Sequence, residues 1–418
     1  MALKNCRLLS GFILGALAAL IWPYISPTVN DLTAPPKDQD SSCQDADSLP
    51  EWRFLVSRVP FTDGDDQPAL QLVFNVGNSM AKVVQSDSQV VVSAKEAVGA
   101  LDVYEGATLT FTDQTYTVGA AADTRTAAAV ACYRQSTFVM IKPDAMQRAG
   151  EVISRIEEIA TLRIADMRLV ALQPSMARLF YAEHSQRTFF EDLVSYVTSG
   201  PILAMRLVGP DAIKVWREAL GPTDSNEARR SAPGSVRALF GTDKQRNAAH
   251  GSDSREAAGR ELAFFFKDTV DGICSTSEPL TELSCLVLPH VLKDRALGSL
   301  WRSLHQHHDC TPARAELVRL NYIDAWRYAT ATLLPRTPPT PQQMDEMQSL
   351  LSGPAVSLHL KSSRPEETRS EFLHRFKDII GPRNPAKARK AAVESIRANF
   401  GQTNTTSGVL CPWYDWLI

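Results

Sequence analysis

The chain has 418 residues, of which 44% are hydrophobic and 22% are charged, and its formal net charge at pH 7 is −3. This composition is ordinary for a globular protein of roughly two to four domains. Because the charge is slightly negative and no basic run is present, the sequence argues against nucleic acid as the principal partner.

The N-terminal segment, residues 1–50, begins with Lys4 and Arg7 followed by an apolar run at residues 8–22. A basic start and an apolar run are typical of a signal peptide or a short membrane anchor, and the run is short for a full span. A buried N-terminal helix is an equally open interpretation. Residues 26–50 are rich in Ser, Thr, Pro, Asp and Gln and are expected to form a flexible linker.

Residues 51–133 contain short runs rich in Val, Leu, Phe and Thr, separated by Asp, Gly and Asn turns. The runs lie at 70–74, 89–92, 108–111 and 116–118. Runs of this length between turn residues predict strands, so we expect a small all-β domain here, a barrel or a sandwich.

Residues 134–271 show a different pattern, in which short apolar strands alternate with amphipathic helices. The periodicity predicts strands at 137–141, 163–172 and 202–207, and helices at 151–159, 176–184 and 211–220. This alternation predicts an α/β fold.

The segment from Arg246 to Arg255 places His250 among small and polar residues, well after the sequence Ile141–Asp144. A histidine nucleophile needs room for an incoming phosphoryl group, and Gly, Ala and Ser leave that room. Asn247 and Ser252 offer hydrogen bonds beside it. The pattern indicates phosphotransfer, although a lone histidine at a Gly-Ser turn is more often an ordinary loop residue.

Several further motifs lie between these two segments, and their order and spacing are informative together. They are residues 181–190, Thr198–Pro201, Trp216–Asp224 and Ala232–Arg237. With these motifs, residues 137–266 closely resemble the nucleoside diphosphate kinase family over the length of its domain. One departure is that residues 144–151 are slightly shorter than the family's usual stretch, where we expect altered packing without loss of activity.

The resemblance implies a catalytic set made up of His250, Glu261, Lys142, Tyr181 and Ser252. His250 would take the γ-phosphoryl group of a nucleoside triphosphate and pass it to a diphosphate. Glu261 would hold the second imidazole nitrogen, with Ser252 as its hydrogen-bonding neighbour and Tyr181 beside the histidine. Mg²⁺ would bridge the phosphates of the nucleotide, which explains why no dedicated metal-ligand cluster is found in the sequence.

The resemblance also implies a nucleotide-binding set: Lys142, Arg217, Thr223 and Arg237 as phosphate ligands, Phe189 as the ring on which the base stacks, and Asn247 near the ribose. Cations suit this role, because phosphoryl transfer depends on positioning and on spreading charge from the transferring oxygens. Stacking discriminates poorly among bases, so we expect many nucleotides to be accepted. Each of these residues alone is more commonly a surface charge or a core ring.

An internal repeat predicts a second kinase-like copy at residues 283–418. Ser352-Gly353-Pro354 repeats Ser199-Gly200-Pro201 at an offset of 153 (352 − 199), and Arg397 repeats Arg237 at an offset of 160 (397 − 237). The chemistry is replaced: the counterparts of Lys142, Arg217, Thr223 and His250 are Leu288, Lys377, Arg383 and Leu410. Among the counterparts of the phosphate ligands, only Arg397, which corresponds to Arg237, is the same residue in both copies. The chain stops before a counterpart of Glu261. We therefore expect a catalytically inactive packing domain.

This order of parts resembles the flagellar branch of the family, in which a β-rich module precedes two kinase copies. The resemblance implies tandem ferredoxin-like α/β sandwiches after a small all-β domain, with the two copies packed against each other as family subunits are. It also implies a place on the cytoplasmic side of the ciliary or flagellar axoneme, with microtubules as a partner. Two functions remain open: an active kinase, and a structural axonemal component whose kinase activity is incidental.

Seven scattered cysteines without paired spacing favour reduced thiols in a cytosol-facing protein. We expect Cys132 and Cys285 in strands. The tract His305–Cys310 holds three histidines, an aspartate and a cysteine, which invites a zinc site. Because no partner pair is found elsewhere, a surface loop is the favoured interpretation.

Overall fold

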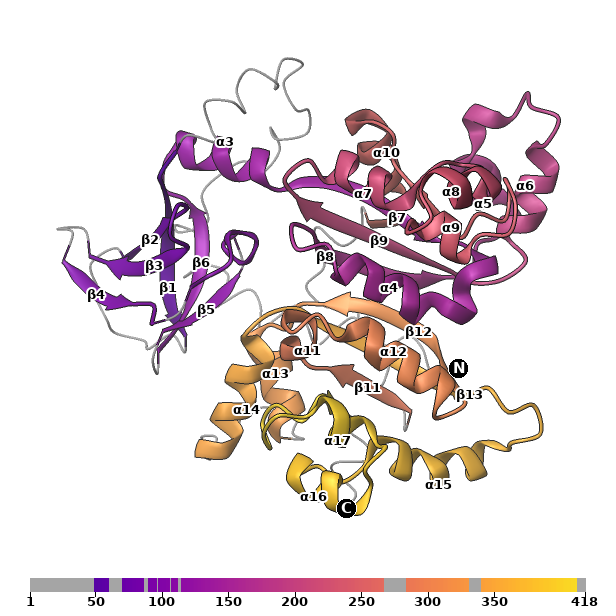
Figure 1. The fold of residues 1–418 in the computed structure, drawn as a ribbon. Helices are drawn as coiled ribbons and strands as arrows, with labels where there is room; N and C mark the ends of the chain where they lie inside the picture. The colour runs from indigo at the N-terminus through magenta and orange to yellow at the C-terminus, as the bar shows by residue number, and fades with distance from the viewer. Residues whose placement is uncertain are drawn as a thin grey trace, which may run out of the picture. The chain divides into compact units, whose positions relative to one another are not determined.

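The structure, a computed structural model, describes residues 49–59, 70–85, 89–95, 97–105, 107–111, 114–266, 283–330 and 340–411 (Figure 1). The predictions for the apolar run at 8–22 and for most of the linker lie outside the described residues. Within the described ranges, no helix is long and apolar enough to cross a membrane.

The first described part is one antiparallel sheet with the strand order β4-β3-β2-β1-β6-β5. Its strands are β1 (Glu51–Val59), β2 (Leu70–Asn75), β3 (Met80–Val84), β4 (Val90–Ser93), β5 (Thr108–Phe111) and β6 (Gln114–Ala121), with a 3₁₀ turn η2 (Ala100–Asp102). Alternate side chains, such as Trp52 and Phe54, face one apolar core. The predicted small all-β domain is confirmed. Its described strands form one sheet in which β4 and β5 are not paired with each other, so the two-sheet sandwich was wrong and no barrel is closed between these strands.

Helix α3 (Thr124–Tyr133) leads from this sheet into the first kinase-like copy. Its N-terminus is capped by Asp123, whose carboxylate accepts a hydrogen bond from the Thr126 amide at 2.7 Å. The ring of Tyr133 packs edge-on against Trp52, with centroids 5.3 Å apart. Cys132 therefore lies in a helix, and its predicted strand position was wrong.

The first copy, drawn in purple to red in Figure 1, has four antiparallel strands in the order β10-β7-β9-β8. They are β7 (Gln135–Ile141), β8 (Arg163–Val170), β9 (Ile202–Gly209) and β10 (Ala249–Gly251). The helices are η3 (Pro143–Arg148), α4 (Ala149–Glu157), α5 (Pro174–Phe180), η4 (Ala182–His184), α6 (Phe190–Val197), α7 (Ala212–Leu220), α8 (Ser225–Ser231), α9 (Val236–Phe240) and α10 (Arg255–Phe266). This is the ferredoxin-like α/β sandwich that the sequence predicts.

The second copy repeats the same arrangement, with the strand order β12-β13-β11-β14. Its strands are β11 (Ser284–Val287), β12 (Cys310–Val318), β13 (Ala355–Ser362) and β14 (Val409–Leu410). Its helices are α11 (Pro289–Lys293), α12 (Leu297–Gln306), α13 (Tyr322–Thr330), α14 (Pro341–Leu351), α15 (Arg369–Ile380), α16 (Pro385–Ala391) and α17 (Ile396–Phe400). Leu410 pairs with Leu286 just as His250 pairs with Met140, so the register agrees with the offsets found in the sequence.

The two copies share one eight-stranded sheet, because β8 of the first copy pairs with β12 of the second. Glu316 lies opposite Arg168, and the Arg168 Nη2 to Glu316 Oε1 distance is 2.7 Å. Each copy therefore covers an edge strand that would otherwise expose unpaired backbone groups.

Helices α4 and α12 cross at two glycines in this interface. A Cβ atom on Gly150 would lie 2.6 Å from the Arg302 amide nitrogen, and one on Gly298 would lie 2.4 Å from the Ser154 nitrogen. Both carboxylate oxygens of Glu157 accept amide hydrogen bonds at 2.9 Å from the first turn of α12. The close approach requires glycine on both helices, and the carboxylate satisfies donors at the start of α12.

The cysteines depart from the prediction of reduced thiols. Cys285 of β11 and Cys411, directly after β14, form a disulfide, and Cys132 is also disulfide-bonded. Cys285 does lie in a strand, as predicted. Among the described residues, Cys310 is a free cysteine, and burial raises the pKa of its thiol to about 12.

The tract His305–Cys310 ends helix α12 and begins β12, and only its middle forms a turn. The His308 ring contacts the backbone oxygen of Glu394 at 3.0 Å, and the described residues contain no group of three or more side chains suited to a metal ion. The favoured surface-loop interpretation is confirmed for residues 307 and 309, whereas His308 is buried within the turn and Cys310 is buried in the sheet.

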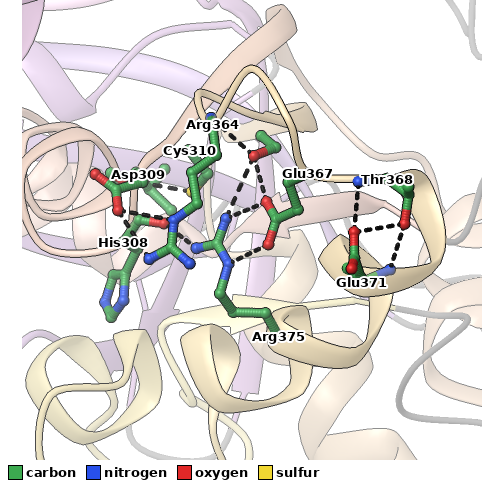
Figure 2. A network of polar contacts seen from close by, with 10 residues as sticks. His308, Asp309, Cys310, Arg364, Glu367, Thr368, Glu371 and Arg375 are labelled. Atoms are coloured by element: carbon green, nitrogen blue, oxygen red, sulfur yellow. Dashed lines mark hydrogen bonds and ion pairs between the residues drawn. The ribbon is translucent and has the colours of Figure 1, made fainter.

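Figure 2 shows two ion pairs on the loop between β13 and α15, of which one joins the loop to this turn and the other joins it to α15. Arg375 Nη2 lies 2.6 Å from Glu367 Oε2, and Arg364 Nη2 lies 2.9 Å from Asp309 Oδ2. The hydrogen bond from Arg375 lowers the pKa of the Glu367 carboxyl to about 2. The corresponding connection in the first copy is a tight turn at Asp211, whose φ is 49°. The loop of the second copy is longer than this turn, and ion pairs fix its position.

Candidate active site

His250 lies in the short strand β10, and its imidazole is held by a chain of hydrogen bonds. His250 Nε2 lies 2.7 Å from Glu261 Oε1, and Ser252 Oγ donates to Glu261 Oε2 at 2.6 Å. Ser252 Oγ in turn accepts a hydrogen bond from the Phe138 amide at 3.1 Å. The carboxylate from α10 is therefore fixed at both oxygens, and the sequence prediction that brings these residues together agrees with the geometry.

The strand that carries His250 is positioned by Trp216 of α7. The indole Nε1 of Trp216 donates to the His250 backbone oxygen at 3.3 Å. A Cβ atom on Gly251 would lie 2.4 Å from the same indole, so only glycine fits beside it. The sequence shows Trp216 only as part of a motif, and this role could not be predicted from it.

The bond to Glu261 determines which imidazole nitrogen is free. A carboxylate beside Nε2 favours the tautomer with a proton on that atom, which leaves a lone pair on Nδ1. The His250 side chain is 24% exposed, so a ligand can reach it. The arrangement can supply a nucleophile at Nδ1 and a negative charge that stabilises the cationic intermediate.

An aromatic wall surrounds the histidine. The rings of Phe138 and Phe180 lie 5.9 and 6.0 Å from the imidazole, centroid to centroid. Tyr181 is buried, and burial followed by the Glu261 charge raises the pKa of its phenol, which therefore stays neutral. The rings cover part of the imidazole, and Tyr181 lies close enough to Glu261 for the carboxylate charge to act on its phenol.

Lys142 enters the site directly after β7 and is 8% exposed. Its Nζ donates to Asn247 Oδ1 at 2.8 Å. Burial, followed by the charge of Arg237, lowers the pKa of Lys142 to about 8. Burial, followed by the charge of Arg217, lowers the pKa of Arg237 to about 10. The three cations lie near enough to repel one another, and an anion bound among them would relieve that repulsion.

Asp144 has a role in the site that was not predicted from the sequence. Its carboxylate accepts hydrogen bonds from the Tyr196 hydroxyl and, at 3.0 Å, from the amide of Ala248. Ala248 has a φ of 66°, a left-handed conformation that turns the chain just before β10. Asp144 thus stabilises the turn that positions His250. Its place in the sequence, two residues after Lys142, was the feature that could have pointed to this role.

Two predicted nucleotide ligands also hold the loops around the site. Asn247 Nδ2 donates to the backbone oxygens of Thr223 at 2.9 Å and of Lys244 at 3.1 Å. Arg237 Nη1 donates to the backbone oxygen of Gly221 at 3.0 Å and to Thr223 Oγ1 at 3.4 Å. Both side chains therefore have a structural task besides any contact with a ligand.

The remaining predicted ligands are exposed around the same region. Phe189 is 48% exposed at the start of α6, Arg217 lies in the last turn of α7, and Thr223 follows that helix in a loop. Exposure leaves all three available to a ligand. Their contacts with base and phosphate stay predictions.

The arrangement of residues around His250 agrees with the family of proteins that this chain resembles in sequence. The family model described as nucleoside diphosphate kinase matches residues 135–270. Nucleoside diphosphate kinase homolog 7 of Rattus norvegicus is 34% identical over 294 residues, which are 69% of this chain and 70% of that protein. The chain belongs to the nucleoside diphosphate kinase family.

Two shorter relatives align with about one copy. A nucleoside diphosphate kinase of Ignicoccus hospitalis is 47% identical over 133 residues, 31% of this chain and 88% of that protein. A probable nucleoside diphosphate kinase 5 of Arabidopsis thaliana is 46% identical over 140 residues, 33% of this chain and 97% of that protein. Membership of this family supports phosphotransfer between nucleotides as the general chemistry.

Proposed function

We propose that the first copy is an active nucleoside diphosphate kinase that works through a phosphohistidine at His250. The observation that carries the proposal is the chain from His250 Nε2 to Glu261 to Ser252, with distances of 2.7 and 2.6 Å. It leaves Nδ1 as the nucleophilic nitrogen and supplies a carboxylate at the opposite side of the ring.

In the first half-reaction, the Nδ1 lone pair of His250 forms a bond to the γ-phosphorus while the bond to the β,γ-bridging oxygen breaks. The diphosphate leaves with the bonding electrons. In the second half-reaction, a terminal oxygen of another diphosphate attacks the phosphorus and the P–N bond returns its electrons to Nδ1. Lys142, Arg217 and Arg237 would stabilise the charge on the phosphoryl oxygens. The nucleotide enters as its Mg²⁺ complex, so the metal belongs to the substrate.

The test is to incubate the full chain with ATP labelled in its γ-phosphate and Mg²⁺. An acid-labile, base-stable phosphoprotein should form, and it should lose its label to an added diphosphate. His250→Ala should abolish both label and exchange, because alanine offers no lone pair. The matched control is His307→Ala, because His307 is an exposed histidine of the second copy, outside the residues proposed for the site. Exchange that survives in His250→Ala would overturn the assignment.

We further propose that this kinase works on the cytoplasmic side of a ciliary or flagellar axoneme, with microtubules as its partner. The support is the order of parts, in which an all-β sheet precedes two kinase-like copies and the second copy lacks the catalytic side chains. The second candidate is a structural axonemal role with incidental catalysis, and the replaced side chains of the second copy favour it. Imaging of tagged, full-length protein in ciliated cells tests the location. Label on a membrane instead would favour an anchor or signal at residues 8–22.

A further inference from the structure

A cleft of about 760 Å³ lies away from His250, and none of the predicted catalytic or nucleotide-binding residues lines it. Its walls come from the loop before β5, from β8 and from loops of the second copy. Six lysine or arginine side chains face it: Lys95, Arg134, Arg163, Lys293, Arg295 and Arg319. Two carboxylates, those of Asp102 and Glu157, also line it. The cleft therefore carries an excess of positive charge in a chain whose net charge is −3.

Two of these arginines are fixed by backbone carbonyl groups of the first copy. Arg295 Nη2 donates to the Ala160 oxygen at 2.7 Å, and Arg163 Nη1 donates to the same oxygen at 3.0 Å. Carbonyl oxygens orient a guanidinium group without neutralising its charge. Arg163 is also 4.0 Å from Asp102 Oδ1, which offsets part of its charge, whereas Arg295 keeps its full charge. The positions of the cations are thus set before any ligand arrives, which reduces the ordering that binding requires.

A second group of cations gathers around Tyr104. The guanidinium carbon of Arg134 lies 4.2 Å from the centre of that ring, and the one of Arg319 lies 5.8 Å away. Asp166 is shared by Arg206 at 2.6 Å and by Arg319 at 3.9 Å. One carboxylate therefore serves two arginines while a third stands close by. The charges of Arg206 and Arg319 add to burial in lowering the pKa of Arg134 to about 10.

Two exposed lysines complete the wall. Lys95 and Lys293 both line the cleft, and neither forms an ion pair with another residue in the ranges that the structure describes. His290 lines it too, and burial lowers the pKa of its imidazole, so the neutral form dominates at pH 7. The lysines are the charges most available to a ligand.

We propose that this cleft binds a small anion that carries a chain of phosphates, at a site separate from His250. The volume falls in the range of small-molecule sites, and its cations converge on a concavity instead of running along a surface stripe. Tyr104 is engaged by two guanidinium groups, so phosphates rather than a base would be recognised. A nucleoside triphosphate and free inorganic polyphosphate share this chemistry.

The experiment titrates inorganic tripolyphosphate into the full chain by calorimetry. We expect two binding events, one at the kinase site and one at the cleft. Lys95→Glu with Lys293→Glu should remove one event or weaken it at least tenfold. The control is Lys387→Glu with Lys390→Glu, two exposed lysines of α16 that do not line the cleft. Binding that Lys95→Glu with Lys293→Glu leaves unchanged, or equal affinities in the two double variants, would overturn the proposal.

Competition then identifies the source of the phosphates. Displacement of tripolyphosphate from the cleft by ATP but not by adenosine indicates a nucleotide, whereas failure of ATP to displace it indicates an inorganic polyphosphate. Binding of an oligoglutamate peptide with no binding of tripolyphosphate would contradict the proposal, because it would show a site for acidic protein. Exchange activity of the cleft variant should stay within about twofold of wild type, because the catalytic residues are untouched. The calorimetric result stands whether or not the first copy exchanges phosphate.

Discussion

Arg237 of the first copy and Arg397 of the second hold corresponding loops in the same way. Arg237 Nη1 donates to the Gly221 oxygen at 3.0 Å, and Arg397 Nη1 donates to the Gly381 oxygen at 3.1 Å. Arg397 is fully buried. An arginine that keeps these bonds in a copy without the histidine has a structural reason to be there. Its presence in the first copy is therefore weaker support for phosphate binding than the presence of Lys142.

Two turn glycines, like the two arginines, have the same structural role in both copies. Gly221 and Gly381 both have a φ of 79°, and a Cβ atom on them would lie 2.3 and 2.2 Å from the hydroxyl oxygens of Ser235 and Ser395. Both the backbone conformation and the close contact require glycine. The positions shared by the copies are those that shape the chain.

The positions that differ are those nearest to the proposed chemistry. Arg383 stands where the first copy has Thr223, and its Nη2 lies 2.7 Å from Glu346 Oε2. Its charge is thus neutralised by a carboxylate of the same copy, which reduces any attraction for phosphate. Leu410 stands in the place of His250 and offers no lone pair.

The last strand of each copy is held by a different bond. In the first copy Trp216 contacts Gly251 and hydrogen-bonds to the neighbouring backbone. In the second copy the corresponding ring is Phe376, and Cys411 occupies the position of the glycine in a disulfide with Cys285. A smaller ring leaves room for a side chain, and a covalent bond replaces the indole hydrogen bond.

The largest expected effect concerns the first copy. Glu261→Gln keeps the shape of the side chain but removes the charge that stabilises the imidazolium-like intermediate, so the exchange rate should fall about 10- to 1,000-fold. Nucleotide affinity, measured by calorimetry, should change little. Glu256→Gln, an exposed substitution on the same helix, should leave the rate unchanged. An unchanged exchange rate in Glu261→Gln would contradict the catalytic role, whereas rate and affinity falling together would indicate misfolding of the variant.

The sequence predicted the positions of the kinase elements because their motifs are local and their turns require particular residues. It missed β1, in which Glu51 and Arg53 alternate with Trp52 and Phe54 until the apolar pair Leu55 and Val56 interrupts the period. It also missed α3, whose short apolar side chains give a weak helical period. The pairing of Cys285 with Cys411 depends on two strands 126 residues apart becoming neighbours, which spacing alone does not reveal. The same is true of Asp144, whose partners come from α6 and from the turn before β10.

The next effect is on stability of the second copy. The disulfide closes a loop of 126 residues, and Cys285→Ala with Cys411→Ala should lower the free energy of unfolding by about 4 kcal/mol through the entropy of the unfolded chain. Hydrogen exchange of β11 and β13 amides in the full chain measures it. Cys310→Ala, at a free buried cysteine, is the control for loss of a thiol alone. Unchanged protection in the double variant would show that the disulfide does not hold the strand.

A smaller loss is expected from Arg397→Met. The variant leaves the backbone oxygens of Gly381 and Val409 without their donor, which should destabilise the second copy by about 2–3 kcal/mol. Urea unfolding, monitored by a probe in the second copy, measures the change in the free energy of unfolding. Exchange activity should stay near wild type. Arg237→Met should destabilise the first copy by a similar amount and also reduce activity. Equal loss of activity in both variants would contradict the conclusion that Arg397 has only a structural role.

The smallest expected effect is a pH dependence that only the first copy has, since Leu288 replaces Lys142 in the second. Burial and Arg237 lower the pKa of Lys142 to about 8, so its cation is present below pH 8 and is lost above it. The charged fraction falls about threefold between pH 7.5 and 8.5, and KM for the nucleotide should rise by about the same factor. Stability of the free protein should change in the opposite sense: the unfolded lysine binds its proton more tightly, so the free energy of unfolding rises as pH increases through 8. Lys142→Arg keeps the charge over this range and should flatten the KM profile. A wild-type KM that does not change between pH 7.5 and 8.5 would show that Lys142 is not a phosphate ligand.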